Sequence, residues 1–405
     1  MTWNERVVVI GSGLAGVRLA RRLGELGTPV TLIGEERHPP YNRVLLAEVL
    51  AGRYGPEVIA LPAPAEPTRA RVTGIDRAAR TVTCADGTVL AYGRLVLATG
   101  SNPVLPPLRG LFTTGPELPE GVHAFRTLDD CLRLAEAVRP GVRAVVIGGG
   151  LLGVSAARAL AARGARVVVA QQSERLMERR LDPAASMLVE RYLTGLGVEV
   201  HTECRVRDVR GVAGAVRSVE LADGYALDAD LVVLACGVRP RTGLAQAAGL
   251  DVRKGVVVDD ELRTSDPHIH AVGDCAQHAG TVYGLAAPAL EQADALAALL
   301  AGDPTARYTG TRSLTRLTLT GPDSPFDLAA FGETEALPGD DVVQLTDATR
   351  GTHRKVVVRD DRLVGGVLVG ELGTVGALAR AWEGAEPLPS DGGPLLHLLT
   401  HDGGS

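Results

Sequence analysis

The chain has 405 residues, 45% of them hydrophobic and 22% charged, and its formal net charge is −6 at pH 7. At roughly 150 residues per domain, this length predicts two or three domains with sizeable cores. Of the 42 lysines and arginines, all except Lys254 and Lys355 are arginines, and the absence of any basic tail or run argues against a nucleic-acid partner.

The first predicted unit combines a strand, a glycine-rich turn, a helix and a second strand. An apolar β-branched run at residues 7–10 precedes Gly11, Gly13 and Gly16, and a run with helical spacing then leads to a second β-branched run. This order is typical of a parallel sheet with a right-handed crossover. The three glycines suit a tight turn, the approach of backbone to a pyrophosphate, and close helix packing, and the helix N-terminus offers free N–H groups to phosphates.

The same unit returns 137 residues later, with Gly148, Gly150 and Gly153 in place of the first three glycines. The segment LATGSNP at 97–103 lies against LACGVRP at 234–240 with the same offset. Two copies in register are a much stronger signal for dinucleotide binding than one glycine motif.

The two copies differ where a ribose hydroxyl is normally bound. The first carries Glu35, whose carboxylate suits the free ribose of FAD, and the second carries Gln172, which leaves NADH and NADPH both open. We interpret Arg175 as a solvated loop arginine rather than a ligand of a 2′-phosphate. Hydride transfer from nicotinamide to flavin needs little acid or base from the protein, only alignment and a dry site, and no side chain is assigned as catalytic with certainty.

Five cysteines stand at positions 84, 131, 204, 236 and 275, and none belongs to a CxxC motif. This spacing excludes a redox-active CxxC, a zinc ribbon and the usual iron–sulfur patterns, and it fits a reducing cytoplasm. No metal site is expected. No apolar run reaches the ~18 residues of a membrane helix, so we expect a cytoplasmic protein without a membrane contact.

The order of motifs resembles that of the FAD/NAD(P)H-dependent pyridine nucleotide oxidoreductases. The motifs are GSGLAG, PYNRVLL, LATGSNP, GGGLLG, LACGVRP and AVGDCAQHAGTVYGLAAPALEQA. Within that family the chain is most similar to the NADH-dehydrogenase half of assimilatory nitrite reductase large subunits and to ferredoxin and rubredoxin reductases. The likeness runs from about residue 5 to about residue 389 and implies FAD as cofactor with NADH or NADPH as donor.

The resemblance also implies roles for individual residues. Glu35 and the first three glycines would hold the ADP half of FAD, Asp274 would accept a hydrogen bond from the ribityl chain, and Pro288 would open a helix reaching Leu300 whose N-terminus faces the flavin. The full set of candidate cofactor-binding residues is Gly11, Gly13, Leu14, Ala15, Gly16, Glu35, Arg43, Thr99, Gly100, Gly148, Gly150, Leu151, Leu152, Gly153, Gln172, Gly237, Gly273, Asp274, Ala287 and Pro288.

The expected fold is α/β, with two Rossmann-like domains and a small C-terminal α+β domain. The resemblance implies a discontinuous FAD domain at 1–112 and 241–310, with an NAD(P) domain at 113–240 inserted into it. From about residue 311, short alternating runs separated by turn signals predict strands, followed by one helix near 375–382. We assign 311–389 to this third domain, which in the family often forms a homodimer contact, and 390–405 to a loose tail.

Two positions depart from the family pattern. Ser155 stands where relatives usually have a glutamate that approaches the nicotinamide, and Glu48 stands where many relatives with a protein acceptor have a lysine.

The leading hypothesis is a reductase that passes electrons from NAD(P)H through FAD to a separate acceptor protein, such as an iron–sulfur ferredoxin, a rubredoxin or a nitrate or nitrite reductase component. The alternatives are a flavoprotein that reduces a small molecule directly, and a weakly catalytic flavoprotein partner that binds NAD(P)H.

Overall fold

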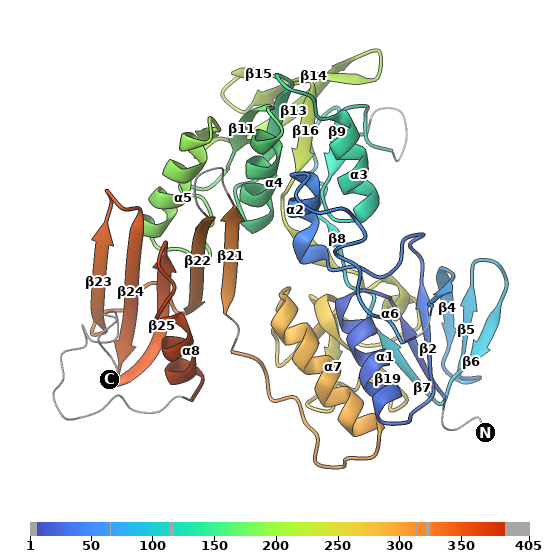
Figure 1. Cartoon of the computed structure of the whole chain (residues 1–405). Coiled ribbons are helices and arrows are strands. Elements are labelled where there is room, and N and C mark those ends of the chain that lie inside the picture. The colour runs from blue at the N-terminus through green and yellow to red at the C-terminus, as the bar shows by residue number, and fades with distance from the viewer. Residues whose placement is uncertain (1–5, 65, 113–116, 313, 321–324, 385–405) are drawn as a thin grey trace.

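The computed structural model describes residues 6–384 apart from 65, 113–116, 313 and 321–324. Within that part of the chain, three five-stranded sheets organise the molecule, and Figure 1 shows them as three bodies around a common centre. The predicted tail at 390–405 lies outside the described residues.

The first sheet is parallel throughout and has the order β19-β7-β1-β2-β3. Its strands are β1 (Val7–Ile10), β2 (Val30–Gly34), β3 (Thr68–Arg69), β7 (Arg94–Leu97) and β19 (Ile269–Ala271). Helices α1 (Leu14–Glu25) and α7 (Ala286–Leu300) lie side by side beside it (Figure 1). Because β19 follows the second repeat in the chain, segments on both sides of that repeat build one sheet.

The second sheet is also parallel and has the order β12-β11-β10-β16-β9. Its strands are β9 (Val122–Ala124), β10 (Arg143–Ile147), β11 (Arg166–Ala170), β12 (Glu199–His201) and β16 (Leu231–Leu234), and its helices are α3 (Leu128–Ala137), α4 (Leu151–Ala162) and α5 (Pro183–Gly195). The order β16-β10-β11 repeats the order β7-β1-β2, so the sequence repeat is a structural repeat and the predicted Rossmann-like α/β fold is confirmed.

Each copy also carries a three-stranded antiparallel sheet that the sequence analysis did not predict. In the first copy it consists of β4 (Val72–Asp76), β5 (Thr81–Cys84) and β6 (Val89–Ala91), and in the second of β13 (Val206–Val212), β14 (Ala215–Leu221) and β15 (Ala226–Asp228). Both precede the equivalent strands β7 and β16, so the repeat extends over the whole unit.

The two copies meet through a short antiparallel ladder of β8 (Ser101–Pro103) and β17 (Val238–Pro240). These strands belong to the matched segments LATGSNP and LACGVRP, so equivalent segments of the two copies pair with each other, with the equivalent residues Asn102 and Arg239 opposite each other at the centre. The remaining short elements are a 3₁₀ turn at Arg43–Leu45, α2 (Leu46–Leu50), α6 (Gly243–Ala247), β18 (Val256–Val258), a 3₁₀ turn at Gly273–Cys275 and β20 (Ala276–His278).

The third sheet is antiparallel and has the order β21-β22-β25-β24-β23, and its strands lie at the alternating runs that predict strands. Its strands are β21 (Thr315–Thr320), β22 (Pro325–Gly332), β23 (Asp341–Asp347), β24 (Thr352–Arg359) and β25 (Arg362–Val369), and α8 (Val375–Gly384) is the predicted single helix. Helix α8 packs on the sheet through Trp382, whose ring centroid lies 5.2 Å from that of Phe331. The expected α+β character is confirmed, while the domain boundaries given above stay predictions.

None of the helices in the described ranges is both long and apolar enough to cross a membrane.

A buried polar contact joins the second and third sheets. Asp182 is the N-cap of α5, where its Oδ1 accepts a hydrogen bond from the Ala185 amide at 3.0 Å. Its Oδ2 lies 2.9 Å from Nε2 of His353, a fully buried residue on β24. The other ring nitrogen, Nδ1, lies 2.8 Å from the Thr346 hydroxyl, and the Lys355 ammonium lies 3.9 Å from Asp182.

Burial alone would raise the pKa of Asp182. The hydrogen bonds from His353 and from the Ala185 amide, together with the electrostatic effects of His353 and Lys355, outweigh burial and hold the pKa of Asp182 below its ordinary value. A carboxyl with a depressed pKa in the folded state stabilises the fold above its ordinary pKa, and that contribution disappears as the pH falls through the folded-state pKa.

We expect Asp182→Ala to lower the free energy of unfolding by about 3 kcal/mol at pH 7. About 1 kcal/mol comes from the lost helix cap and about 2 kcal/mol from leaving His353 buried without its partner. Urea unfolding followed by circular dichroism measures the change, with Glu190→Ala on the exposed face of α5 as the matched control. The difference in the free energy of unfolding between wild type and Asp182→Ala should narrow below pH 4. A difference that stays constant down to pH 3 would contradict the stabilising role assigned to the Asp182 carboxylate.

Candidate functional site

A single cavity of about 2150 Å³ lies where the three sheets meet. This volume exceeds the roughly 300–1,000 Å³ of a typical small-molecule pocket. Both glycine loops line it, together with residues from α7 and from β21. The cavity therefore extends from one glycine loop to the other, and we call its parts at the first and second loops the first arm and the second arm.

The first glycine loop has the geometry that pyrophosphate binding requires. Gly11 has φ +116°, and a Cβ placed there would lie 2.1 Å from the carbonyl oxygen of Ala98. A Cβ at Gly16 would lie 1.9 Å from the carbonyl oxygen of Gly11, whereas a Cβ at Gly13 would meet no atom within 4 Å. Gly11 and Gly16 are thus required by packing, and Gly13 faces the open cavity.

The second loop repeats this pattern. A Cβ at Gly148, which has φ +108°, would lie 2.5 Å from the carbonyl oxygen of Ala235, and a Cβ at Gly153 would lie 1.8 Å from that of Gly148. Gly150 again meets nothing within 4 Å. Gly13 and Gly150 are the N-caps of α1 and α4, and neither helix has a side-chain cap, so free backbone amides face both arms of the cavity.

The residues at the ends of β2 and β11 lie as the repeat predicts. Glu35 lines the first arm, where its carboxylate accepts a hydrogen bond from Arg241. Gln172 lines the second arm and is exposed. Arg175 does not line the cavity; it pairs with Glu174 at 3.4 Å and with Glu335, in the loop between β22 and β23, at 3.6 Å. It is a partly buried bridge between two loops rather than the solvated residue that we expected.

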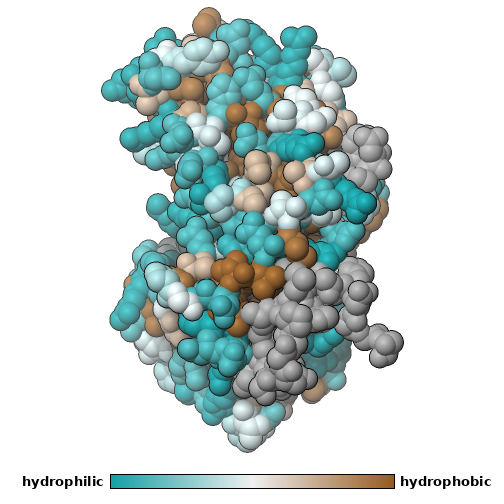
Figure 2. Space-filling view, turned by 90° about the vertical axis from the view of Figure 1, so that its left-hand side faces the viewer, coloured by the Kyte–Doolittle hydropathy of each residue, from teal (hydrophilic) through white to brown (hydrophobic). Residues whose placement is uncertain are grey.

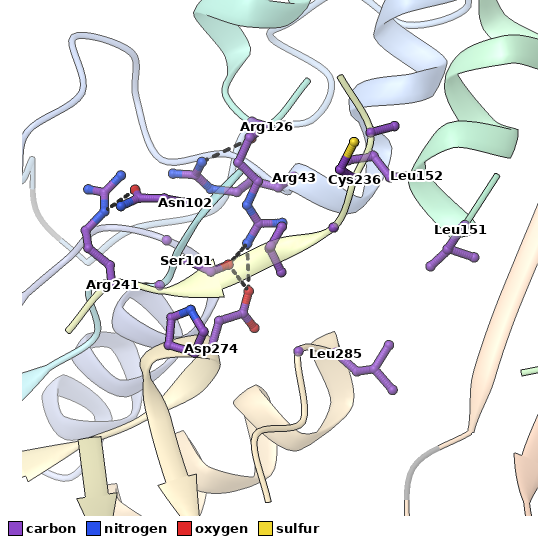
Figure 3. A pocket seen from close by; sticks show the side chains of 18 of the residues that line it. Arg43, Ser101, Asn102, Arg126, Leu151, Leu152, Cys236, Arg241, Asp274 and Leu285 are labelled. Atoms are coloured by element: carbon purple, nitrogen blue, oxygen red, sulfur yellow. Dashed lines mark hydrogen bonds and ion pairs between the residues drawn. The ribbon is translucent and has the colours of Figure 1, made fainter. Parts of the chain in front are cut away.

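A polar cluster stands in the wall of the first arm (Figure 3). Asp274 accepts hydrogen bonds from the Ser101 hydroxyl at 2.9 Å and from the Arg126 guanidinium at 2.6 Å. Arg43 donates to the carbonyl oxygen of Arg126 at 3.2 Å and pairs with Glu36. The network presents Asp274 to the cavity from the edge of the first sheet.

Arg126 lines the cavity but was missed by the sequence analysis. Its Nε is buried without a hydrogen-bond partner in the described part of the chain, which fits a site that a polar cofactor completes. A local signal was available: Thr127 and Asp130 directly after it form the capping box of α3 and fix its backbone.

Helix α7 begins at Ala286, two residues earlier than predicted, so Pro288 is its third residue and not its first. A proline is tolerated there because the first four helical N–H groups have no partner within the helix. Pro288 is buried and does not line the cavity, whereas Ala287 does. Gln292 of this helix accepts a hydrogen bond from the Gly273 amide at 2.7 Å and thereby fixes the turn that carries Asp274.

The two departures from the family pattern have separate structural outcomes. Ser155 lines the cavity, and its hydroxyl donates to the Leu151 carbonyl oxygen one turn earlier in α4 at 2.8 Å. Glu48 does not line the cavity; it forms an ion pair with the fully buried Arg158 and lies 3.4 Å from Arg53. Arg158 also donates to the Thr320 carbonyl oxygen of β21 at 3.3 Å.

The structure brings nearly all predicted site residues together. All candidates line the cavity except Gly16, Gly153 and Pro288, of which the two glycines take the packing role expected of the third glycine. Their roles as cofactor ligands stay predictions that the next experiments test.

We expect Gly13→Val to fold and to lose FAD, because its side chain would enter the space left for a pyrophosphate. Gly150→Val should keep FAD and lose nicotinamide binding for the same reason. Absorbance at the flavin band and equilibrium dialysis measure the two outcomes. Gly195→Val, at an exposed helix end, is the control. A Gly13→Val protein that stays yellow would contradict the prediction that the first arm binds FAD.

We expect Arg126→Gln to weaken FAD binding about tenfold or more, since it removes a charged hydrogen bond to Asp274 and the unpartnered Nε. The dissociation constant comes from the recovery of flavin fluorescence on dilution. Arg139→Gln, an exposed arginine just after α3, should leave it unchanged. Equal affinity for FAD in the Arg126 variant and the wild type would show that Arg126 does not contribute to FAD binding.

Comparison with known proteins agrees with this geometry. Residues 5–293 match the family described as pyridine nucleotide-disulphide oxidoreductase. The assimilatory nitrate reductase electron transfer subunit of Bacillus subtilis is 34% identical over 381 residues, which cover 91% of this chain and 48% of that protein. The chain thus spans about half the length of the curated relative.

Two solved structures cover nearly the whole chain. A ferredoxin reductase from Rhodopseudomonas palustris has a TM-score of 0.80 at 30% identity, covering 90% of this chain and 91% of that one. Putidaredoxin reductase, in a covalent complex with putidaredoxin, has a TM-score of 0.84 at 27% identity, covering 98% and 99%. The expected resemblance is confirmed, and FAD and NAD(P)H are the cofactors characteristic of these relatives. The chain belongs to the pyridine nucleotide-disulphide oxidoreductase family.

Proposed function

We propose that this chain is an FAD-dependent NAD(P)H oxidoreductase that delivers electrons to a separate redox protein. The observation that carries the proposal is that both glycine loops open into one cavity, so two dinucleotides bound at them would meet inside it. The flavin supplies the redox chemistry, because it accepts a hydride from a nicotinamide and returns electrons to the acceptor.

The protein's own part is binding, orientation and the exclusion of water. Free amides at α1 and α4 would bind the two pyrophosphates, and Asp274 would accept from the ribityl chain. The N-terminus of α7 has no side-chain cap and lies at the cavity, so its dipole would stabilise negative charge there. These tasks need no acid or base from the protein.

A protein acceptor is supported by the relatives rather than by a docking surface. The relatives named above include an electron transfer subunit and reductases named for their protein acceptors. We therefore propose an acceptor of the same kind, an iron–sulfur protein such as a ferredoxin, or a nitrate or nitrite reductase component. The five cysteines are free thiols, which supports a reducing, cytoplasmic setting.

The expected homodimer contact stays a prediction, and the third sheet supports it. Strand β23 forms one edge of that sheet, and Val342 and Leu345 on it are exposed. An edge strand with exposed apolar side chains can pair with a second copy. Figure 2 shows the side of the molecule on which this sheet lies as mostly hydrophilic, with a local hydrophobic patch.

Anaerobic stopped-flow absorbance of the holoprotein tests the hydride route. We expect a nicotinamide donor to bleach the flavin band within about a second, since typical turnover numbers are 1 to about 10³ per second. In air, oxidation of the donor should stay slow until a ferredoxin is added. Fast, saturable turnover with a quinone and none with ferredoxin would favour direct reduction of a small molecule.

One observation favours the weakly catalytic partner as second candidate. Ser155 places a hydroxyl, already bonded within its own helix, where relatives usually have a carboxylate near the nicotinamide. If the flavin of wild-type protein bleaches slowly and Ser155→Glu accelerates it more than tenfold, this second candidate replaces the first. An unchanged rate in the variant would remove it.

A further inference from the structure

The end of β11 offers no carboxylate to a free ribose 2′-hydroxyl. Gln171 and Gln172 stand there, and the carboxamide of Gln171 is already engaged. Its Oε1 accepts from the Gly149 amide at 2.7 Å, and its Nε2 donates to the Arg175 carbonyl oxygen at 3.3 Å. At equivalent positions, the first copy therefore carries a negative charge on Glu35 and the second copy carries the neutral Gln172.

Arginines gather at this end of the cavity from two segments. Arg179 and Arg180 follow the turn after β11, which is held by the Met177 amide bonding to the Gly149 carbonyl oxygen at 2.9 Å. Arg205 comes from the segment before β13, which pairs with the end of β11 because the Cys204 amide bonds to the Gln171 carbonyl oxygen at 3.0 Å. All three arginines line the cavity and are exposed.

These three guanidinium groups have no ion pair or side-chain hydrogen bond to any other residue that the structure describes. Their neighbours differ in this respect. Arg207, which also lines the cavity, pairs with Glu220 and lies 3.3 Å from Asp208. Glu178 is the single carboxylate among the described residues of the 171–180 and 204–207 segments that line the cavity. Three unpaired positive charges against one negative charge make this end of the cavity attractive to an anion.

NADPH differs from NADH only by a phosphate on the 2′-oxygen of the adenosine ribose. That group carries a charge of roughly −1.5 to −2 at pH 7, and guanidinium forks bind phosphate oxygens in pairs. A carboxylate directly after β11 would repel this phosphate, and the second copy has glutamines there instead. The position after β11 and the unpaired charge beside it thus point to the same ligand.

We propose that NADPH is the preferred donor and that Arg179, Arg180 and Arg205 form the site for its 2′-phosphate. The proposal rests on the proposed function for the identity of the second arm as the nicotinamide arm. Arg175 is not part of this site, because its guanidinium group pairs with Glu174 and Glu335.

Isothermal titration of the FAD-loaded protein with adenosine 2′,5′-bisphosphate and with 5′-ADP tests the site without any hydride transfer. We expect the first ligand to bind at least about tenfold more tightly, and Arg205→Gln to weaken it about tenfold or more while changing 5′-ADP affinity less than about twofold. Arg179→Gln should act in the same direction. Arg166→Gln, an exposed arginine at the opposite end of β11 that does not line the cavity, is the matched control.

Equal affinities for the two ligands, or a loss in Arg205→Gln that is the same for both, would overturn the proposal. Bleaching of the flavin band by NADH and by NADPH distinguishes a failure of the phosphate site from a failure of the proposed function. Equally fast and equally saturable bleaching by NADH and NADPH overturns the phosphate site and leaves the reductase standing. If neither donor bleaches the flavin but 2′,5′-bisphosphate still binds selectively and depends on Arg205, the phosphate site stands and the reductase does not.

Discussion

The pairing of β8 with β17 is the constraint on which the rest of the site depends. Equivalent segments of the two copies pair here, with Asn102 opposite Arg239 at the centre of the ladder. Side chains reinforce the pair, because the Thr99 hydroxyl donates to the Arg241 carbonyl oxygen at 2.8 Å and the Arg241 guanidinium contacts both Asn102 and Glu35. Since each segment directly follows a central strand of its sheet, the ladder brings the carboxyl ends of both sheets, where ligands bind in this fold, to one cavity.

Within that shared frame, the two arms differ in charge rather than in backbone. Both glycine loops place two glycines against backbone and leave the middle one open, so the same physical requirement holds twice. Beyond the loops the first arm presents Glu35 and Asp274, and the second presents neutral Gln172 and arginines that have no ion pair with any residue that the structure describes. A duplicated unit can keep the part that binds pyrophosphate, which every dinucleotide shares, and vary the part that contacts the rest of the ligand.

The sequence was informative where the cause of the structure is local. Glycine spacing, β-branched runs and the 137-residue offset predicted both Rossmann-like units because a tight turn and a close helix require glycine at fixed positions. Arg126 and Arg241 escaped prediction because their roles depend on partners up to about two hundred residues away in the chain. The antiparallel sheets of each copy escaped because strands as short as β6 and β15 carry no periodic signal. The start of α7 was placed two residues late because proline fits any position in the first turn.

The ion pair of Glu48 with Arg158 shows how a buried charge can be kept out of the cavity. Arg158 stands one helical turn after Ser155, but its charge is buried in the ion pair with Glu48 and does not line the cavity, whereas Ser155 does. Breaking such a pair leaves an uncompensated charge, so it acts mainly to fix the contact of α2 with α4, and the bond of Arg158 to Thr320 extends that contact to β21. Since no charged side chain stands at position 155, alignment of the two ring systems is left to packing and backbone. On the proposed function the nicotinamide would lie beside Ser155, where the wall carries a hydroxyl in place of a titrating carboxylate, so a change of pH would not alter the charge at that position.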